Sequence, residues 1–242
     1  HEGNARMYTD YTIMTAHRPL VREVNAVFDF IEKPYTPVNF KELLVSPNDM
    51  RKRLIALINK EIKNKEQGKE AYILAKVNHI TDRALIEKLY EASTAGVQVE
   101  LVVRGNCSLV TGIAGISENI HINGIIDRYL EHSRIFIFAN GGEEKYYIGS
   151  ADWMPRNLDN RIEVLAPVYD KEIQADLKRI VCYGYRDTAK GRIVDGTGEN
   201  RPWENRPSTL CKDFTPALAE AETATVVFRS QEELYRKYKN IL

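Results

Sequence analysis

The chain has 242 residues, of which 43% are hydrophobic and 28% are charged, with 34 basic and 34 acidic side chains. This composition is ordinary for a globular protein and excludes a wholly disordered, collagen-like or coiled-coil chain, and a core of this size needs no disulfide or metal to hold it. A net charge of zero gives no global argument for binding to nucleic acid or to an anionic membrane, so positive groups that hold an anion must be local.

The first forty residues do not have the pattern of a complete domain. Residues 6–15 alternate loosely and are rich in Tyr and Thr, which predicts a strand, and apolar residues at helical spacing over 21–31 predict a helix. Pro34 and Pro37 then indicate a linker. Because one strand and one helix cannot build a core, we interpret residues 1–42 as the end of a preceding domain. The start at His1, without an initiator Met or a signal peptide, suggests a cut into a longer chain.

Regular alternation begins after the linker. Residues 40–45 form a short extended run, and Ser46 with Pro47 predicts the N-cap and first position of a helix over 48–66 that ends at Gly68. A buried strand is expected over 71–77, then a helix capped by Thr81 and running through Ala95, then a strand over 97–103.

Four further strands and two helices are predicted downstream. The strands cover 120–126, 133–139, 146–150 and 161–168, and the helices cover 171–184 and 230–238, whereas residues 185–206 are expected to be irregular. Alternating strands and helices predict an α/β domain over residues 43–242, with a largely parallel or mixed sheet flanked by helices.

The cysteines and the hydropathy pattern add two expectations. Cys107, Cys182 and Cys211 are widely spaced and include no C-x-x-C pair, so we expect buried thiols in a reducing compartment and no zinc site. No apolar run approaches the ~20 residues that cross a bilayer.

Two segments place polar side chains at strand ends. His132 and Arg134 open a strongly apolar strand, and residues two apart on a strand point to the same face. Downstream, Ser150 and Asp152 lie in a Gly-Ser-Ala-Asp turn that could orient a histidine and hold phosphate oxygens. The alternative interpretation is a surface histidine beside an ordinary strand and turn.

Arg104 and two tyrosines are further candidates. Arg104 follows a predicted parallel strand, where open α/β sheets bind ligands, and its guanidinium could grip a phosphate, although a solvated loop arginine explains it as well. Tyr8 and Tyr11 could stack on a base, or they could be core or interface tyrosines. A Gly-rich phosphate loop with the G-x-x-x-x-G-K-[ST] pattern is absent from the sequence.

Taken together, the segments resemble the C-terminal part of the bacterial polyphosphate kinase family. The resemblance is carried, in the family's order, by NARMYTDY, LLVSPNDMRKRLIALINKEI, AYILAKVNHITD, ELVVRGNCSLVTGI, YLEHSRIFIFANGGEEKYYIGSADWMPRNLDNRIEV and, more weakly, FRSQEELYRKY. It implies two phospholipase-D-like catalytic domains, each giving one histidine-containing half of a shared site. Residues 1–42 would then end the first of these domains, and residues 43–242 would form the second with an irregular C-terminal tail.

The resemblance also implies roles for residues of this chain. His132 becomes the second-half histidine, Arg134 occupies the slot where phospholipase D has Lys, and the turn that contains Ser150 and Asp152 replaces that superfamily's G-S-x-N turn. Tyr8, Arg104 and His132 fall on the family's ATP-contacting positions. The histidine that the family phosphorylates, and its magnesium-associated residues, are expected upstream of His1, so no metal ligand is expected within this chain.

The implied activity is reversible transfer of the terminal phosphate of ATP to an enzyme histidine and then to polyphosphate, with Mg²⁺ as cofactor. The implied partners are ATP, ADP and inorganic polyphosphate, without nucleic acid, in a cytoplasmic homo-oligomer that could associate peripherally with the inner membrane. By itself the chain is expected to be inactive. Two alternatives stay open: a phosphodiesterase or nuclease of the phospholipase D superfamily, and an inert module that binds nucleotide or polyphosphate.

Overall fold

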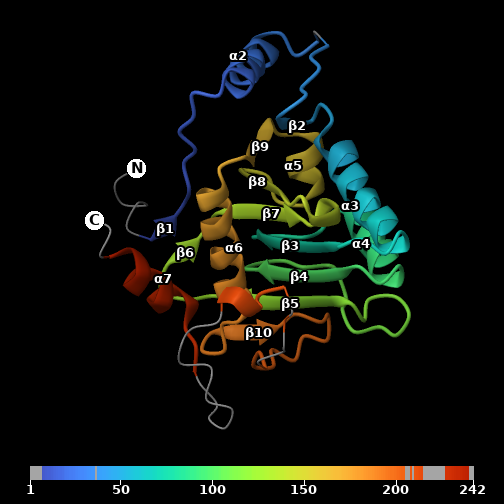
Figure 1. The fold of residues 1–242 in the computed structure, drawn as a ribbon, viewed down its shortest axis with the longest axis vertical. Coiled ribbons are helices and arrows are strands. Elements are labelled where there is room, and N and C mark those ends of the chain that lie inside the picture. Colours follow the sequence, from blue (N-terminus) through green and yellow to red (C-terminus); the bar gives the residue numbers. More distant parts are fainter. Residues whose placement is uncertain (1–6, 36, 205–207, 209, 215–226, 240–242) are drawn as a thin grey trace.

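The structure of the chain is a computed structural model, which describes residues 7–35, 37–204, 208, 210–214 and 227–239. Its centre is an eight-stranded sheet with strand order β10-β5-β4-β3-β7-β8-β9-β2 (Figure 1). In chain order these strands are β2 (Leu44–Ser46), β3 (Tyr72–Val77), β4 (Gln98–Val103), β5 (Ile120–Ile125), β7 (Arg134–Phe138), β8 (Lys145–Gly149), β9 (Glu163–Val168) and β10 (Gly191–Ile193).

The sheet is mixed, which confirms the expected fold class. Only the β3–β4 and β4–β5 pairs are parallel, and the other pairs of neighbours run antiparallel. The helix-containing crossover expected from the alternation of strands and helices is therefore confined to one part of the sheet, where helix α4 (Arg83–Thr94) joins β3 to β4.

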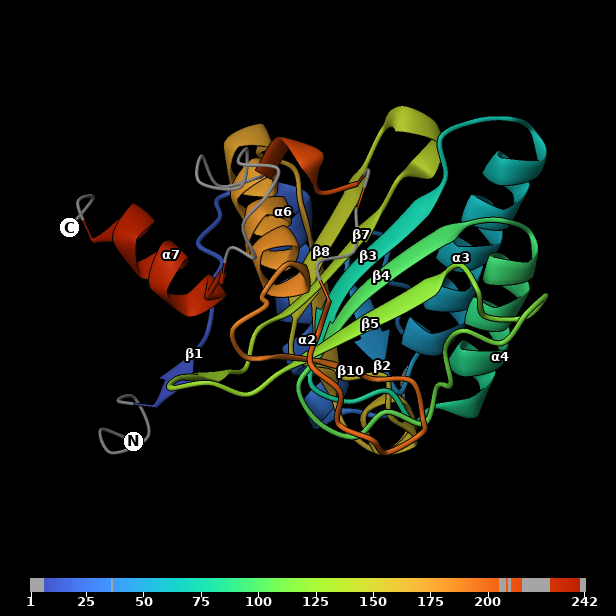
Figure 2. The ribbon, with the colours of Figure 1, turned by 90° about the horizontal axis from the view of Figure 1, so that it is seen from below.

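Helices cover both faces of the sheet, as Figure 2 shows most clearly. Helix α3 (Met50–Glu66) lies beside α4 on one face, and α6 (Lys171–Tyr185) crosses the other. Two shorter α-helices lie further along the chain: α5 (Pro155–Asp159) after β8, and α7 (Ser230–Tyr238) beyond the strand ends near α6.

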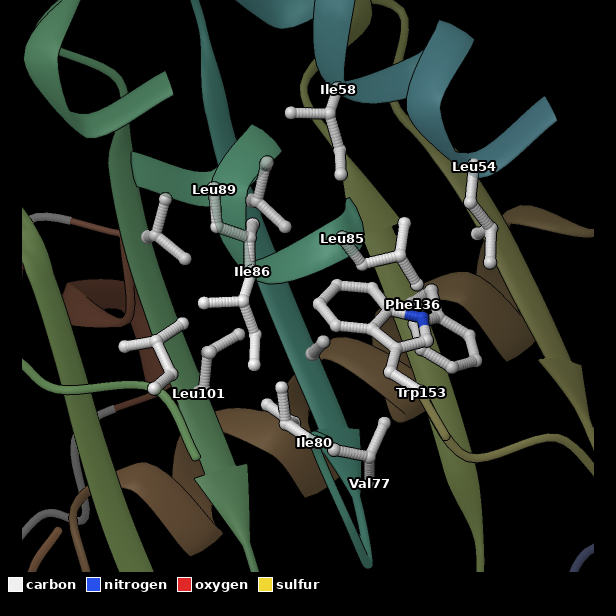
Figure 3. Close-up of a cluster of buried hydrophobic side chains, with 14 of the residues drawn as sticks. Leu54, Ile58, Val77, Ile80, Leu85, Ile86, Leu89, Leu101, Phe136 and Trp153 are labelled. Carbon is white, nitrogen blue, oxygen red and sulfur yellow. The ribbon is translucent and has the colours of Figure 1, made fainter. Parts of the chain in front are cut away.

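The alternating side chains of the strands build two cores. On β3, Ile73 and Ala75 face α3 and α4, whereas Leu74 faces α6. The first core is shown in Figure 3, where Phe136 stacks on Trp153 with the ring centroids 5.4 Å apart beneath the helices. Each large side chain that is fully buried contributes roughly 1.5–3 kcal/mol of transfer free energy, so burial on both faces is the main favourable contribution to the stability of the sheet.

The N-terminal segment packs in a separate apolar cluster outside the two cores. Helix α2 (Arg18–Glu32) confirms the predicted helix, and Leu20, Val27 and Phe30 pack against a separate apolar cluster that includes Phe40 and Leu43. The predicted strand over 6–15 is reduced to β1 (Tyr8–Thr9), which pairs in parallel with β6 (Leu130–Glu131), and residue 6 lies outside the described residues. The division into domains at residue 42 stays a prediction.

Both predicted helix caps are wrong, although the helices themselves are confirmed. Ser46 is the last residue of β2, because β2 pairs with β9 and carries Ser46 opposite Glu163. Its hydroxyl oxygen lies within hydrogen-bond distance of the carbonyls of Asn157 (2.7 Å) and Arg161 (2.8 Å), to either of which it can donate. Helix α4 is capped by Asp82, whose carboxylate accepts from the backbone N–H of Leu85 at 3.1 Å. Aspartate is at least as good a cap as threonine, so the neighbouring acid takes the position.

The segment expected to be irregular contains β10, which pairs antiparallel with β5 at one edge of the sheet. Its three residues, Gly191–Ile193, lack any β-typical alternation, so only the exposed edge of β5 makes them a strand.

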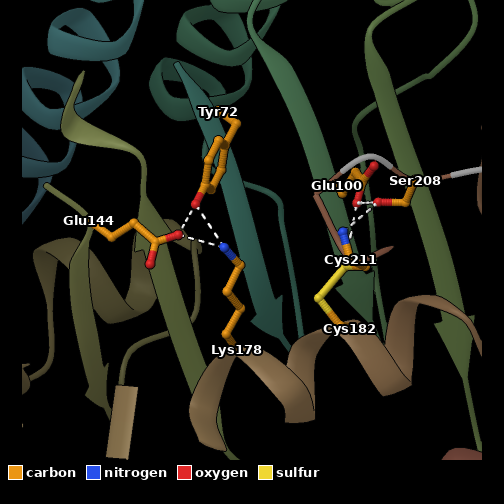
Figure 4. The surroundings of a disulfide bond; sticks show 7 residues. All are labelled: Tyr72, Glu100, Glu144, Lys178, Cys182, Ser208 and Cys211. Atoms are coloured by element: carbon orange, nitrogen blue, oxygen red, sulfur yellow. Dashed lines mark hydrogen bonds and ion pairs between the residues drawn. A yellow bond between two sulfur atoms is a disulfide. The ribbon is translucent and has the colours of Figure 1, made fainter. Parts of the chain in front are cut away.

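The structure also corrects the expectation for two of the three cysteines. Cys182 on α6 and Cys211 form a disulfide, with their Cα atoms 5.3 Å apart, and Glu100 accepts a hydrogen bond from Ser208 beside them (Figure 4). The two cysteines are 29 positions apart in the sequence, and only the packing of residues 210–214 onto α6 brings them together. Cys107 remains a free thiol, and burial raises its pKa.

None of the described helices is both long enough and apolar enough to span a lipid bilayer.

Candidate functional site

Three loops meet where β3, β4 and β8 end and β7 begins. Backbone hydrogen bonds join them: the N–H of Gly105 donates to the carbonyl of Asn78 (2.7 Å), that of Ile80 to Asn106 (2.9 Å), and that of Trp153 to His79 (3.1 Å). Parallel strands bring their carboxyl ends to one edge, and the antiparallel β7 and β8 add their own start and end to it. The polar side chains of these loops are therefore held by a continuous backbone network.

Asp152 is the centre of this edge. Its residue is 3% exposed, and its carboxylate accepts from the backbone N–H of Asn78 (2.7 Å) and of His79 (3.3 Å). The side-chain amide of Asn78 approaches the same carboxylate at 3.3 and 3.4 Å. Arg134 donates to it from Nε (3.3 Å) and Nη2 (3.0 Å), which makes a buried ion pair. The carboxylate thus ties β7 to the loop after β3.

Arg134 links this ion pair to His132. Its Nη1 donates to the backbone carbonyl of His132 at 2.8 Å and lies 3.2 Å from Nδ1 of the imidazole. The prediction that the two side chains share a face is confirmed by this contact. Asp152 contacts Arg134 rather than the imidazole, so the turn influences His132 through the guanidinium.

His132 is also held from the N-terminal segment. Asp10 Oδ1 lies 3.2 Å from its Nδ1, and the ring of Tyr8 stands edge-on to the imidazole, with the ring centroids 5.3 Å apart. The backbone N–H of His132 donates to the carbonyl of Thr9 at 3.0 Å, which extends the β1–β6 pairing. Because Asp10 and Arg134 both face Nδ1, the other ring nitrogen, Nε2, is the one left for a ligand.

Arg104 lies at the same edge, after β4. Its Nε donates to the side-chain Oδ1 of Asn78 at 2.9 Å. Within the described part of the chain, its terminal nitrogens make no hydrogen bond, and no carboxylate pairs with it. The site therefore contains two arginines in different states: the charge of Arg134 is offset by a buried carboxylate, and that of Arg104 is not.

His79 packs closely on the loop that carries Arg104. The backbone N–H of Asn106 donates to its Nδ1 at 2.9 Å. A Cβ placed at Gly105 would lie 2.5 Å from the imidazole, so any larger residue would displace the His79 ring. The sequence interpretation missed His79, Asn78 and Asp10, although the first two directly follow a predicted parallel strand, which was the available signal.

Ser150 is not brought to His132. It is exposed, and its hydroxyl accepts from the backbone N–H of Val164 at 3.3 Å, which fastens the end of β8 to β9. The neighbouring position 149 requires glycine for steric reasons, because a Cβ there would lie 1.9 Å from the carbonyl oxygen of Val164.

A buried ion pair supports the segment just before His132. Glu131 accepts from Lys76 of β3 at 2.8 Å and from Gln231 of α7 at 2.9 Å. Burial by itself would raise the pKa of Glu131, but Lys76 and Gln231 outweigh it and hold the pKa below its usual range. The amide of Gln231 also bonds the backbone of Tyr129, so α7 clamps the strand that leads to His132.

Comparisons with known proteins find the same family that the sequence segments resemble. The family model described as polyphosphate kinase C-terminal domain 2 matches residues 43–212. A polyphosphate kinase from Escherichia coli (strain K12) is 46% identical over 228 residues, which are 92% of this chain and 33% of the relative. One from Vibrio vulnificus (strain YJ016) is 48% identical over 195 residues, 81% of this chain and 28% of the relative.

The fold agrees as well. The crystal structure of polyphosphate kinase from Porphyromonas gingivalis superposes with a TM-score of 0.84 at 38% identity, covering 98% of this chain and 34% of that one. The chain thus spans about a third of the length of the relatives that it matches. The family model covers most of the strands and every residue of the sheet edge from Asn78 to Asp152. Together with this superposition, it shows that the chain belongs to the polyphosphate kinase family.

Proposed function

We propose that this chain is the C-terminal catalytic part of a polyphosphate kinase, which transfers the terminal phosphate of ATP reversibly to polyphosphate. The observation that carries the proposal is Arg104, an arginine without a carboxylate partner in the described residues, whose Nε is fixed by Asn78 and whose terminal nitrogens are free. Phosphoryl transfer depends mainly on positioning and on positive charge around the transferring oxygens, and a guanidinium fork supplies both.

His132 is proposed as the acid–base group of the reaction. Its Nδ1 lies 3.2 Å from both Asp10 Oδ1 and Arg134 Nη1, so it donates to Asp10 when it carries the proton and accepts from Arg134 when it does not. Either hydrogen bond orients the ring and leaves Nε2 for a phosphoryl oxygen. An imidazole is a general acid or base of enzymes, so His132 can donate a proton to the leaving ADP oxygen or withdraw it in the reverse reaction. Tyr8 packs against the imidazole, and the residue is 38% exposed, so it is accessible to the nucleotide.

The covalent step is assigned to a histidine outside this chain. Its nitrogen would attack the terminal phosphorus of ATP, the bond to the bridging oxygen would break, and ADP would leave. The phosphoryl group would then pass from that nitrogen to the terminal oxygen of polyphosphate. The 242-residue chain alone is therefore expected to fold without turning over ATP.

Magnesium enters the proposal only as a partner of the nucleotide. In the described part of the chain, no three His, Cys, Asp or Glu side chains gather as potential metal ligands. The carboxylate at the edge, Asp152, is already occupied by Arg134 and by the N–H groups of Asn78 and His79. These residues do not fit a magnesium site, and no step of the reaction is assigned to the ion here.

Homo-oligomer formation and a cytoplasmic location with peripheral membrane association complete the proposal.

The decisive experiment incubates the full-length enzyme with ATP labelled in its terminal phosphate. Label on the protein that is stable in base and released in acid, followed by labelled polyphosphate, supports a phosphohistidine kinase. Cleavage of a phosphodiester substrate without protein labelling would instead support the phosphodiesterase alternative. Synthesis of polyphosphate by the purified 242-residue chain would contradict the placement of the nucleophile outside it.

A further inference from the structure

We infer that Asn78 is a positioning residue that aims the guanidinium of Arg104 at the phosphate, taking its own orientation from the buried Arg134–Asp152 pair. The inference rests on the proposed function, because it concerns how the phosphate-gripping arginine is held. Asn78 is 1% exposed and lies between the two arginines of the site.

The amide of Asn78 has only one orientation that satisfies both neighbours. Its Nδ2 faces the carboxylate oxygens of Asp152 at 3.3 and 3.4 Å, and its Oδ1 accepts from Arg104 Nε at 2.9 Å. A flipped amide would set an oxygen against the carboxylate and an NH₂ group against the guanidinium, which is unfavourable at both ends. The charge of Asp152 therefore fixes the acceptor that Arg104 needs.

The backbone of the Arg104 loop does not depend on this side chain. The N–H groups of Arg104 and Gly105 donate to the carbonyls of Val77 (3.3 Å) and Asn78 (2.7 Å), and these bonds survive truncation of Asn78. What truncation removes is the one hydrogen bond within the described residues that fixes the direction of the Arg104 side chain. A long side chain released in this way regains rotamer freedom, which has to be lost again in the transition state.

The test is a double-mutant cycle in the full-length enzyme with Asn78→Ala and Arg104→Lys. Lysine has no Nε–H to donate to Asn78, so the second substitution removes the same interaction from the other side. We expect Asn78→Ala alone to lower kcat/KM for ATP by about threefold to thirtyfold, and to lower it by less than about twofold when Arg104 is already Lys.

The matched control is Asn123→Ala. Asn123 is also fully buried, and its Nδ2 lies 3.1 Å from each of the carbonyl oxygens of Gly184, Tyr185 and Asp187 at the end of α6. It should lower Tm at least as much as Asn78→Ala while leaving kcat/KM within about twofold of wild type. This separates loss of positioning from loss of stability.

The outcomes distinguish the positioning role of Asn78 from the phosphate-binding role of Arg104. Equal losses from Asn78→Ala in both backgrounds, or an equal kinetic loss in Asn123→Ala, would overturn the positioning role and leave Arg104 as the phosphate grip. Wild-type kinetics for Arg104→Lys alone would overturn the phosphate grip and the positioning role together. A loss from Asn78→Ala that disappears in the Lys background, without a kinetic loss in the control, is the result that supports the inference.

Discussion

Replacing Asp152 by Asn in this chain would remove the negative charge from the middle of the site and leave the shape unchanged. Asp152 is 3% exposed, and its side chain pairs with an arginine whose side chain is 10% exposed. The new amide keeps an oxygen for the backbone N–H groups of Asn78 and His79, but Arg134 loses its only carboxylate among the described residues. The guanidinium charge then remains buried without compensation.

The cost follows from that stranded charge. Removing one partner of a buried ion pair typically costs 3–5 kcal/mol, and the lower end applies here because one oxygen is kept and Arg134 still donates to the carbonyl of His132, so we expect a loss of about 3 kcal/mol. In a chain of this length, each kcal/mol shifts Tm by about 2–4 °C, so Tm should fall by about 6–12 °C.

Thermal and urea unfolding followed by circular dichroism measure this loss. Glu87→Gln is the control, because Glu87 pairs with Arg83 at 2.7 Å in an exposed i,i+4 contact, and its neutralisation should cause no measurable shift. Adding Arg134→Met to Asp152→Asn removes the stranded charge and should recover part of the lost Tm. Equal Tm values for Asp152→Asn and Glu87→Gln would refute the buried-pair reasoning.

Four other changes have definite expected outcomes. In the full-length enzyme, His132→Ala should lower polyphosphate synthesis by roughly a hundredfold to ten-thousandfold with Tm unchanged, and phosphate mapped by mass spectrometry to His132 itself would reverse its assignment as the acid–base group. Arg104→Lys should lower kcat/KM by about tenfold to a few hundredfold, because Lys keeps the charge and loses the planar fork; unchanged kinetics would return Arg104 to a solvated loop. Burial raises the pKa of Glu100 to about 7, so the folded chain holds a proton that the unfolded chain releases, and stability should fall as the pH rises from about 5 to about 7.5; urea unfolding of Glu100→Gln should show a shallower fall, and an identical slope would contradict the assignment. The Cys182–Cys211 bridge joins residues 29 apart, so reduction should cost about 3–4 kcal/mol in the chain-entropy account, seen as a Tm drop in reductant that the Cys211→Ser variant does not show.

Local sequence patterns determined most of the elements. The patterns over residues 48–66, 71–77 and 97–103 predict α3, β3 and β4, because a helix that buries one face and strands that bury both faces must carry apolar residues at those positions. His132 and Arg134 could be paired from spacing alone, since residues two apart on a strand share a face. Arg104 could be placed at a ligand-binding edge because parallel strands end together.

Tertiary structure decided the features that depend on residues far apart in the chain. Asn78 directly follows a predicted strand, but its partners Arg104 and Asp152 come from other loops, which meet it because β3 lies between β4 and β7. Asp10 has no motif that marks it, and it joins the site because β1 pairs with β6. Ser46 has the sequence signature of a cap, yet pairing with β9 turns it into a strand residue, and β10 exists because the edge of β5 has unpaired backbone groups to satisfy. The Cys182–Cys211 bridge likewise requires a segment from beyond β10 to fold back onto α6. Periodicity reports which face of an element is buried, whereas the partner that buries it is set by the packing of the whole chain.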